Sequence, residues 1–134
     1  MSVTLTDQNK LTLRTAAWGA VSLMSAAGAA GSAHKVATHG SIALTSATGQ
    51  VGHVLAKAPR GVKYGRTVAE LADQVLPALT AAMILLREQA PAEADDFRRT
   101  VVVAVEAAAR AEQGEPGPAV AEMARKITAA LDAA

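Results

Sequence analysis

Side chains that could bind a ligand or take part in catalysis are concentrated between His34 and Arg66. This stretch holds all three histidines, the only tyrosine, five of the ten glycines and five basic residues, and it contains no acidic residue. Positive charge combined with glycine amides is typical of sites that bind phosphate or carboxylate groups. If this protein has a ligand site, we expect it in this stretch.

The basic residues of this stretch fall into two groups that could meet an anion. Lys35 and His39 are four residues apart and would share one face of a helix. The basic segment 57–66 contains Gly61 and Gly65, whose amides could donate to a bound phosphate. The alternative is a solvated loop that docks on the acidic second half of the chain. The candidate ligand-binding residues are Lys35, His39, His53, Lys57, Arg60, Lys63 and Tyr64.

The histidines are poorly spaced for a metal site. His34 and His39 are five residues apart, which places them roughly 140° apart around a helix. The chain has no cysteine, and no carboxylate lies between Gln8 and Ala69, so further ligands would have to come from distant segments. We expect no metal site and no cofactor, and we expect each histidine to be solvated or to bond a backbone carbonyl.

Residues 42–52 read Ile-Ala-Leu-Thr-Ser-Ala-Thr-Gly-Gln-Val-Gly, with a hydrophobic start and a glycine turn. This segment resembles the first strand and glycine turn of short-chain dinucleotide-binding dehydrogenases, in which the turn contacts a pyrophosphate. Ser46 stands where that family has its first glycine, and the chain lacks a second strand and an alternating βαβ pattern. We adopt the competing interpretation, a helix that ends at Gly49 and turns through Gly52.

Nucleophilic catalysis would need a hydroxyl, a histidine and an orienting carboxylate close together in space. Ser41, Thr45 and Ser46 are near His39 in the sequence, but any carboxylate must come from the second half of the chain. Sequence spacing does not assemble such a set, so we do not expect an enzyme.

The composition favours a single all-α domain covering residues 1–134. Alanine, the best helix former, supplies 33 of the 134 residues, and Trp18, Tyr64 and Phe97 are the only aromatic residues. The net charge of +1 is unevenly spread. Residues 1–66 contain seven basic residues and one acidic residue, whereas residues 67–134 contain six basic and eleven acidic residues. The positive half is too sparse for a nucleic-acid footprint, so we expect the two halves to neutralise each other.

The uncharged run from Thr15 to His34 is 20 residues long, about the length of a membrane span. Its many glycine, serine and alanine residues make it too polar for a span, and its flank is unlike that of a signal peptide. We therefore expect a cytoplasmic protein that is not inserted in a membrane.

Helix signals recur along the chain after a short polar tail at 1–6. Thr4 or Thr6 could cap a first helix that ends at Gly28 or Gly31, and its small residues suggest a dimer interface. A second helix is expected over 34–48 and a short one over 50–57, followed by the main loop at 58–66. A capping box then starts a 22-residue helix with Pro77 inside it, and prolines open two further helices. The pattern predicts a compact antiparallel bundle of five or six helices.

Two functions are compatible with these patterns. The first is a helical interaction module that forms a homodimer or binds a protein partner, which regular amphipathic helices favour. The second is a domain that binds a small anion, whether or not it is also an enzyme, with its site between His34 and Arg66.

Overall fold

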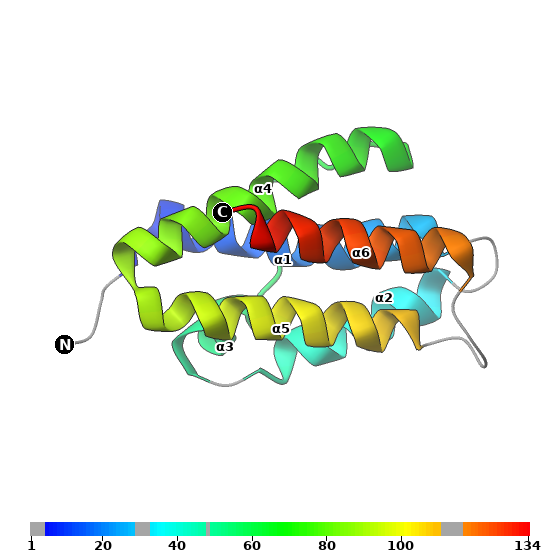
Figure 1. Cartoon of the computed structure of the whole chain (residues 1–134). Helices are drawn as coiled ribbons and strands as arrows, with labels where there is room; N and C mark the ends of the chain where they lie inside the picture. The colour runs from blue at the N-terminus through cyan, green and yellow to red at the C-terminus, as the bar shows by residue number, and fades with distance from the viewer. Residues whose placement is uncertain (1–4, 29–32, 48, 111–116) are drawn as a thin grey trace.

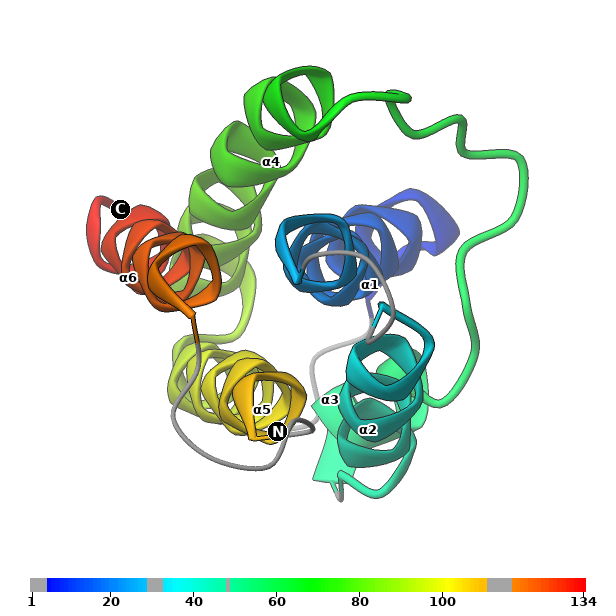
Figure 2. The ribbon, with the colours of Figure 1, turned by 90° about the vertical axis from the view of Figure 1, so that its right-hand side faces the viewer.

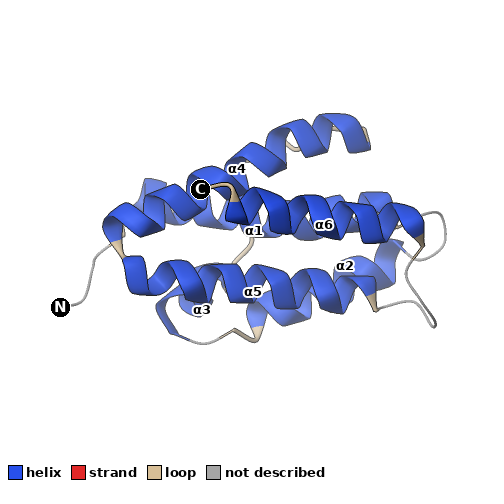
Figure 3. Cartoon of the chain, in the orientation of Figure 1, coloured by secondary structure: helices blue, strands red, loops and turns tan. Residues whose placement is uncertain are grey.

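The computed structural model describes residues 5–28, 33–47, 49–110 and 117–134, and each regular element within these ranges is a helix (Figure 1, Figure 3). The side chains of residues 33–37 and 39 also lie outside the described part. The all-α bundle is confirmed. The short helix expected after the second one is also present, which brings the helices of the described ranges to six. The helices are α1 (Asp7–Ala27), α2 (Ala33–Thr45), α3 (Gly49–Leu55), α4 (Val68–Gln89), α5 (Pro91–Ala109) and α6 (Pro118–Asp132).

Helix α1 lies inside the bundle and contacts each of the other five helices (Figure 2). Its sequence explains this position, because apolar and small residues cover most of its circumference. The prediction that its small residues form a dimer interface is wrong, since Ala16 and Ala20 are fully buried within the single chain. The buried residues of α1 are Leu13, Ala16, Ala17, Gly19, Ala20, Val21, Leu23 and Met24.

Glycines set the spacing between α1 and two of its neighbours. A Cβ atom on Gly19 would lie 2.7 Å from Cγ2 of Val75 in α4. A Cβ atom on Gly40 of α2 would lie 2.8 Å from Cγ1 of Val21. Both distances are shorter than normal carbon contacts, so the helices approach this closely only because these positions lack a side chain.

The predicted N-terminal caps of the two long helices are present. The Thr6 hydroxyl accepts from the Asn9 amide at 3.0 Å, and the Thr67 hydroxyl accepts from the Glu70 amide at 3.1 Å. The Glu70 carboxylate accepts in return from the amide of Arg66, at 3.2 Å, rather than from that of the cap residue itself. These bonds satisfy amides at the helix ends that have no partner within the helix.

The glycine turn between α2 and α3 differs from the prediction. Helix α2 ends at Thr45 rather than Thr48, and Gly49, with a φ of 80°, begins α3 instead of closing α2. The Thr45 hydroxyl donates to the carbonyls of Ser41 and Ile42, each at 3.1 Å, in the last turn of α2. Gly52 lies inside α3. Because helices flank the turn on both sides, the likeness to a dehydrogenase strand does not extend to the structure.

The main loop, which links α3 to α4, is anchored on two helices (Figure 2). The Tyr64 hydroxyl donates to the carbonyl of Thr15 in α1 at 3.0 Å. The Gln74 side chain in α4 accepts from the Gly65 amide at 3.0 Å and donates to the Lys63 carbonyl at 2.8 Å. The end of the loop is thus bonded to a backbone carbonyl of α1 on one side and to a side chain of α4 on the other.

Prolines mark the second half of the chain as predicted. Pro91 and Pro118 occupy the first turns of α5 and α6, and Pro77 lies within an unbroken α4. The Arg98 guanidinium of α5 bonds both carboxylate oxygens of Asp132 in α6, at 2.7 and 3.1 Å. These bonds lower the pKa of Asp132 and connect the two helices at the surface.

Candidate functional site

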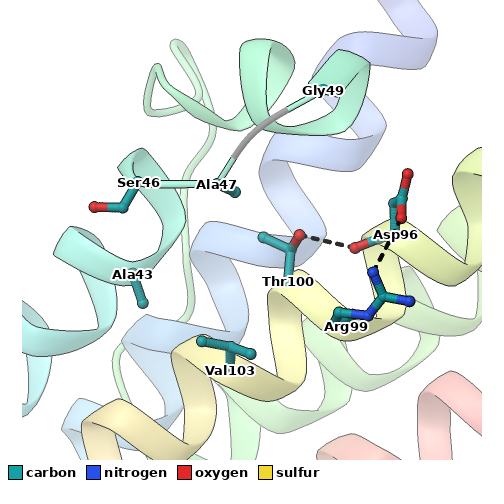
Figure 4. A pocket seen from close by; sticks show the side chains of 8 residues that line it. All are labelled: Ala43, Ser46, Ala47, Gly49, Asp96, Arg99, Thr100 and Val103. Atoms are coloured by element: carbon teal, nitrogen blue, oxygen red, sulfur yellow. Dashed lines mark hydrogen bonds and ion pairs between the residues drawn. The ribbon is translucent and has the colours of Figure 1, made fainter.

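A hollow of about 380 Å³ lies between α2 and α5, below the start of α3 (Figure 4). Its volume is at the lower end of the range of ligand pockets. Helix α5 contributes the charged side chains, Thr100 and Val103, whereas the last turn of α2 and the turn that follows it contribute two alanines and Ser46. The lining residues are Ala43, Ser46, Ala47, Gly49, Asp96, Arg99, Thr100 and Val103.

The polar groups of this hollow are paired with one another. The Arg99 guanidinium lies 3.4 Å from the Asp96 carboxylate, and the Thr100 hydroxyl donates to the Asp96 carbonyl at 2.8 Å. Ser46 is exposed, and its oxygen points away from these groups in Figure 4. Asp96 is a carboxylate from the second half of the chain, as a catalytic set would require, but the side chain of His39 lies outside the described residues.

A second hollow, of about 830 Å³, lies between the start of α1 and the main loop and is rich in positive charge. Arg14, Lys57 and Arg60 line it together with one acidic residue, Asp7. This is the part of the sequence-predicted ligand site that the fold brings together. Three cations against one carboxylate leave a net positive charge of about two, which favours an anion.

One of these cations also has a structural role. Arg14 donates from Nε to the carbonyl of Val54 at 2.8 Å, and Trp18 donates from Nε1 to the carbonyl of Leu55 at 3.2 Å. These carbonyls lie at the C-terminal end of α3, where they have no helical partner. Two side chains of α1 therefore cap α3, which ties the short helix to the centre of the bundle.

The remaining predicted site residues are dispersed. Lys63 is exposed and does not line the basic hollow, and His53 is exposed on α3. Tyr64 is half-buried, and its burial raises the pKa of the hydroxyl to about 12. Lys35 and His39 lie on α2, but their side chains are outside the described part of the chain.

Sequence reasoning did not single out Arg14, Asp96 or Arg99 as site residues. Arg14 had a recognisable signal, because it is the one charge within the otherwise uncharged run from Leu11 to His34. Asp96 and Arg99 had none, since both fit an ordinary solvated helix face. Only the packing of α2 along α5 gives them a hollow to line.

Two general features bear on the kind of site. Among the residues that the structure describes, no three histidine or acidic side chains come together as a metal site. By length and composition, α4 is the one described helix that could cross a membrane. In this structure it packs against other helices through the buried residues Leu71, Val75, Leu79, Ala82, Met83 and Leu86.

Comparison of the chain with protein families, with curated proteins and with solved structures finds no significant match. The function is therefore inferred from the surface and the two hollows.

Proposed function

We propose that this protein is a helical interaction module that associates with itself. The proposal is supported by exposed apolar side chains on two adjacent helices. Ile42 of α2 is 58% exposed and Val103 of α5 is 49% exposed, and Val103 borders the hollow between these helices. Exposed apolar groups beside a hollow with a polar rim are typical of protein contact surfaces.

The composition of the core supports the same proposal. Many of the buried residues are alanine, and Phe97 is the only fully buried aromatic side chain among the described residues. Small side chains bury little apolar area, and burial of such area is the main source of stability. Association through an apolar surface would add to a modest intramolecular core.

The test is sedimentation velocity over a protein range of about 1 µM to about 1 mM, within which weak interfaces dissociate. We expect a concentration-dependent shift from monomer to dimer. Val103→Glu should raise the dissociation constant of the dimer at least about tenfold, because it buries a charge in the contact. Val68→Glu is the matched control, since Val68 is also exposed but lies in the first turn of α4, where an acid is tolerated. A wild-type protein that stays monomeric throughout would refute self-association.

A second function, the binding of a small anion, is favoured by the basic hollow of Arg14, Lys57 and Arg60. Lys57 and Arg60 are exposed and free to turn towards a ligand, whereas Arg14 is fixed by its bond to α3. Asp7 and the C-terminal end of α3 oppose an anion, so the expected affinity is modest.

Thermal unfolding with inorganic phosphate, pyrophosphate or citrate tests this second function. A ligand present at about ten times its Kd stabilises the folded state of a domain of this size enough to raise Tm by roughly 5 °C. Lys57→Ala combined with Arg60→Ala should abolish the rise, whereas Lys63→Ala should preserve it because Lys63 lies outside the hollow. Anion binding is refuted if none of the three compounds changes Tm at a concentration of about 10 mM, at which even a weakly bound ligand would occupy the site.

A further inference from the structure

The outer face of α5 carries a charge pattern that is complementary to itself in the antiparallel direction. Asp95, Arg99, Glu106 and Arg110 follow one another along this face, and the Val102–Val103 pair lies at the midpoint. Arg99 and Glu106 are each about 5 Å along the helix from that midpoint, and Asp95 and Arg110 are each about 11 Å from it. Acid and base therefore exchange places when the helix is reversed about its centre.

These side chains lie together on the surface. Asp95, Arg99, Val102, Val103 and Glu106 line a shared depression of about 370 Å³ on the outer side of α5. The charged members are exposed, with Arg99 at 73% and Glu106 at 55% of the side chain accessible. Spacings of three and four residues place the whole set within roughly 100° of the helix circumference. The face is therefore free to meet a partner helix.

We infer that this protein forms a two-fold symmetric dimer in which α5 of one copy packs antiparallel against α5 of the other. The Val102–Val103 pairs meet on the symmetry axis, Arg99 faces Glu106 of the second copy, and Asp95 faces Arg110 of the second copy. This inference rests on the proposed self-association and adds its surface and register. A two-fold contact requires a surface complementary to itself, and this face meets that requirement.

The neighbouring surface fits this arrangement. A hollow of about 500 Å³ runs between α5 and α6, and its lining is half apolar, from Val102, Val105, Ala124 and Ala129, and half polar, from Glu106, Arg125, Thr128 and Asp132. It lies beside the symmetry axis and can receive the valine of the second copy. Arg98 also lines the depression on α5, but its guanidinium bonds Asp132 of the same chain and so does not place an unpaired charge in the contact.

The intramolecular ion pairs on this face do not prevent the contact. Arg99 is 3.4 Å from Asp96 and Arg110 is 3.9 Å from Glu106, on exposed side chains. Such pairs contribute little in water and leave donors available for a second carboxylate. A contact built on one helix is small, so the expected dissociation constant is micromolar or weaker.

Charge reversal tests the register of this dimer. Arg99→Glu places like charges opposite each other twice per dimer, and Glu106→Arg does the same with the opposite sign. Each variant alone should raise the dissociation constant at least about tenfold by sedimentation velocity. An equimolar mixture of the two variants should form a heterodimer, because the glutamate introduced in one variant then faces the arginine introduced in the other. The double variant Arg99→Glu with Glu106→Arg should associate as the wild type does.

The matched control is Lys63→Glu, which makes the same change in charge on the main loop, across the bundle from α5 (Figure 2). It should leave the dissociation constant unchanged. Circular dichroism should show unaltered folding, since Arg99 and Glu106 are exposed. If the wild type associates but single reversals leave it unaffected, or the mixture stays monomeric, the α5 register is wrong although self-association stands. A monomeric wild type refutes both.

Discussion

Removing the Tyr64 hydroxyl should change stability in opposite directions at neutral and alkaline pH. This hydroxyl donates to the Thr15 carbonyl of α1 at 3.0 Å, from a half-buried position. Tyr64→Phe removes one hydrogen bond and should lower the free energy of unfolding by about 1 kcal/mol at pH 8. The loss is moderate because the carbonyl belongs to a helix and keeps its backbone partner.

The alkaline effect follows from the raised pKa of Tyr64. Burial moves the pKa of Tyr64 from 10.0 to about 12 in the folded protein, because the phenolate loses contact with water. Tyr64 therefore contributes its full stability below pH 10 and loses it as the pH rises from 10 towards 12. A shift of two units corresponds to about 2.7 kcal/mol, which solvent access to the half-buried ring reduces to about 1–2 kcal/mol.

The assay uses the fact that Tyr64 is the only tyrosine, so the absorbance change near 295 nm reports on this group alone. We expect a midpoint near 12 in the folded protein and near 10 in urea. Urea unfolding of the wild type and Tyr64→Phe, compared at each pH, removes the contribution of lysine titration because both proteins share it.

The free energy of unfolding of the wild type should exceed that of Tyr64→Phe below pH 10. This difference should shrink above pH 10 and vanish or reverse by pH 12. If the chain unfolds first, the Phe variant should unfold at the higher pH by circular dichroism. A midpoint near 10 in the folded protein would show that the ring is not docked on α1. The attachment of the main loop through Tyr64 would then be wrong.

Three further substitutions test the packing of the helices. Gly19→Ala should lower the free energy of unfolding in urea by about 1–3 kcal/mol, because the added methyl would lie 2.7 Å from Val75. A stabilised variant would contradict this close approach of α1 to α4. Gln74→Ala should cost about 1–2 kcal/mol and speed hydrogen exchange of the Gly65 amide, and unchanged exchange would argue against this anchor. Thr67→Ala should cost about 1 kcal/mol through loss of the α4 cap, whereas a neutral effect would indicate that the cap is replaced by water.

Most of the helices could be predicted because their signals are local. Thr67 and Glu70 sit at cap spacing, and Pro91 and Pro118 stand at first-turn positions, so α4, α5 and α6 begin where the sequence indicates. The turn between α2 and α3 was less predictable. Gly49 has a φ of 80° and begins α3, and hydrophobic periodicity does not indicate on which side of this glycine the helix continues.

The candidate ligand site was predictable only in part. Lys57 and Arg60 are close in sequence and share one hollow, but Arg14 and Asp7 join them from α1. Nothing in the spacing indicates this meeting, because it depends on the direction in which the main loop leaves α3. The hollow between α2 and α5 likewise combines residues far apart in the chain.

The sequence by itself determined that this protein is helical, where most helices begin, and that Asp95, Arg99, Glu106 and Arg110 are spaced symmetrically, with an acid opposite a base on reversal. The tertiary structure decided which faces remain outside. It buried the small residues of α1, where an interface was predicted, and left the charged face of α5 exposed. The physical reason is that exposure depends on how helices pack against one another. Close approaches such as that of Gly19 to Val75 set that packing, and they have no counterpart in local periodicity.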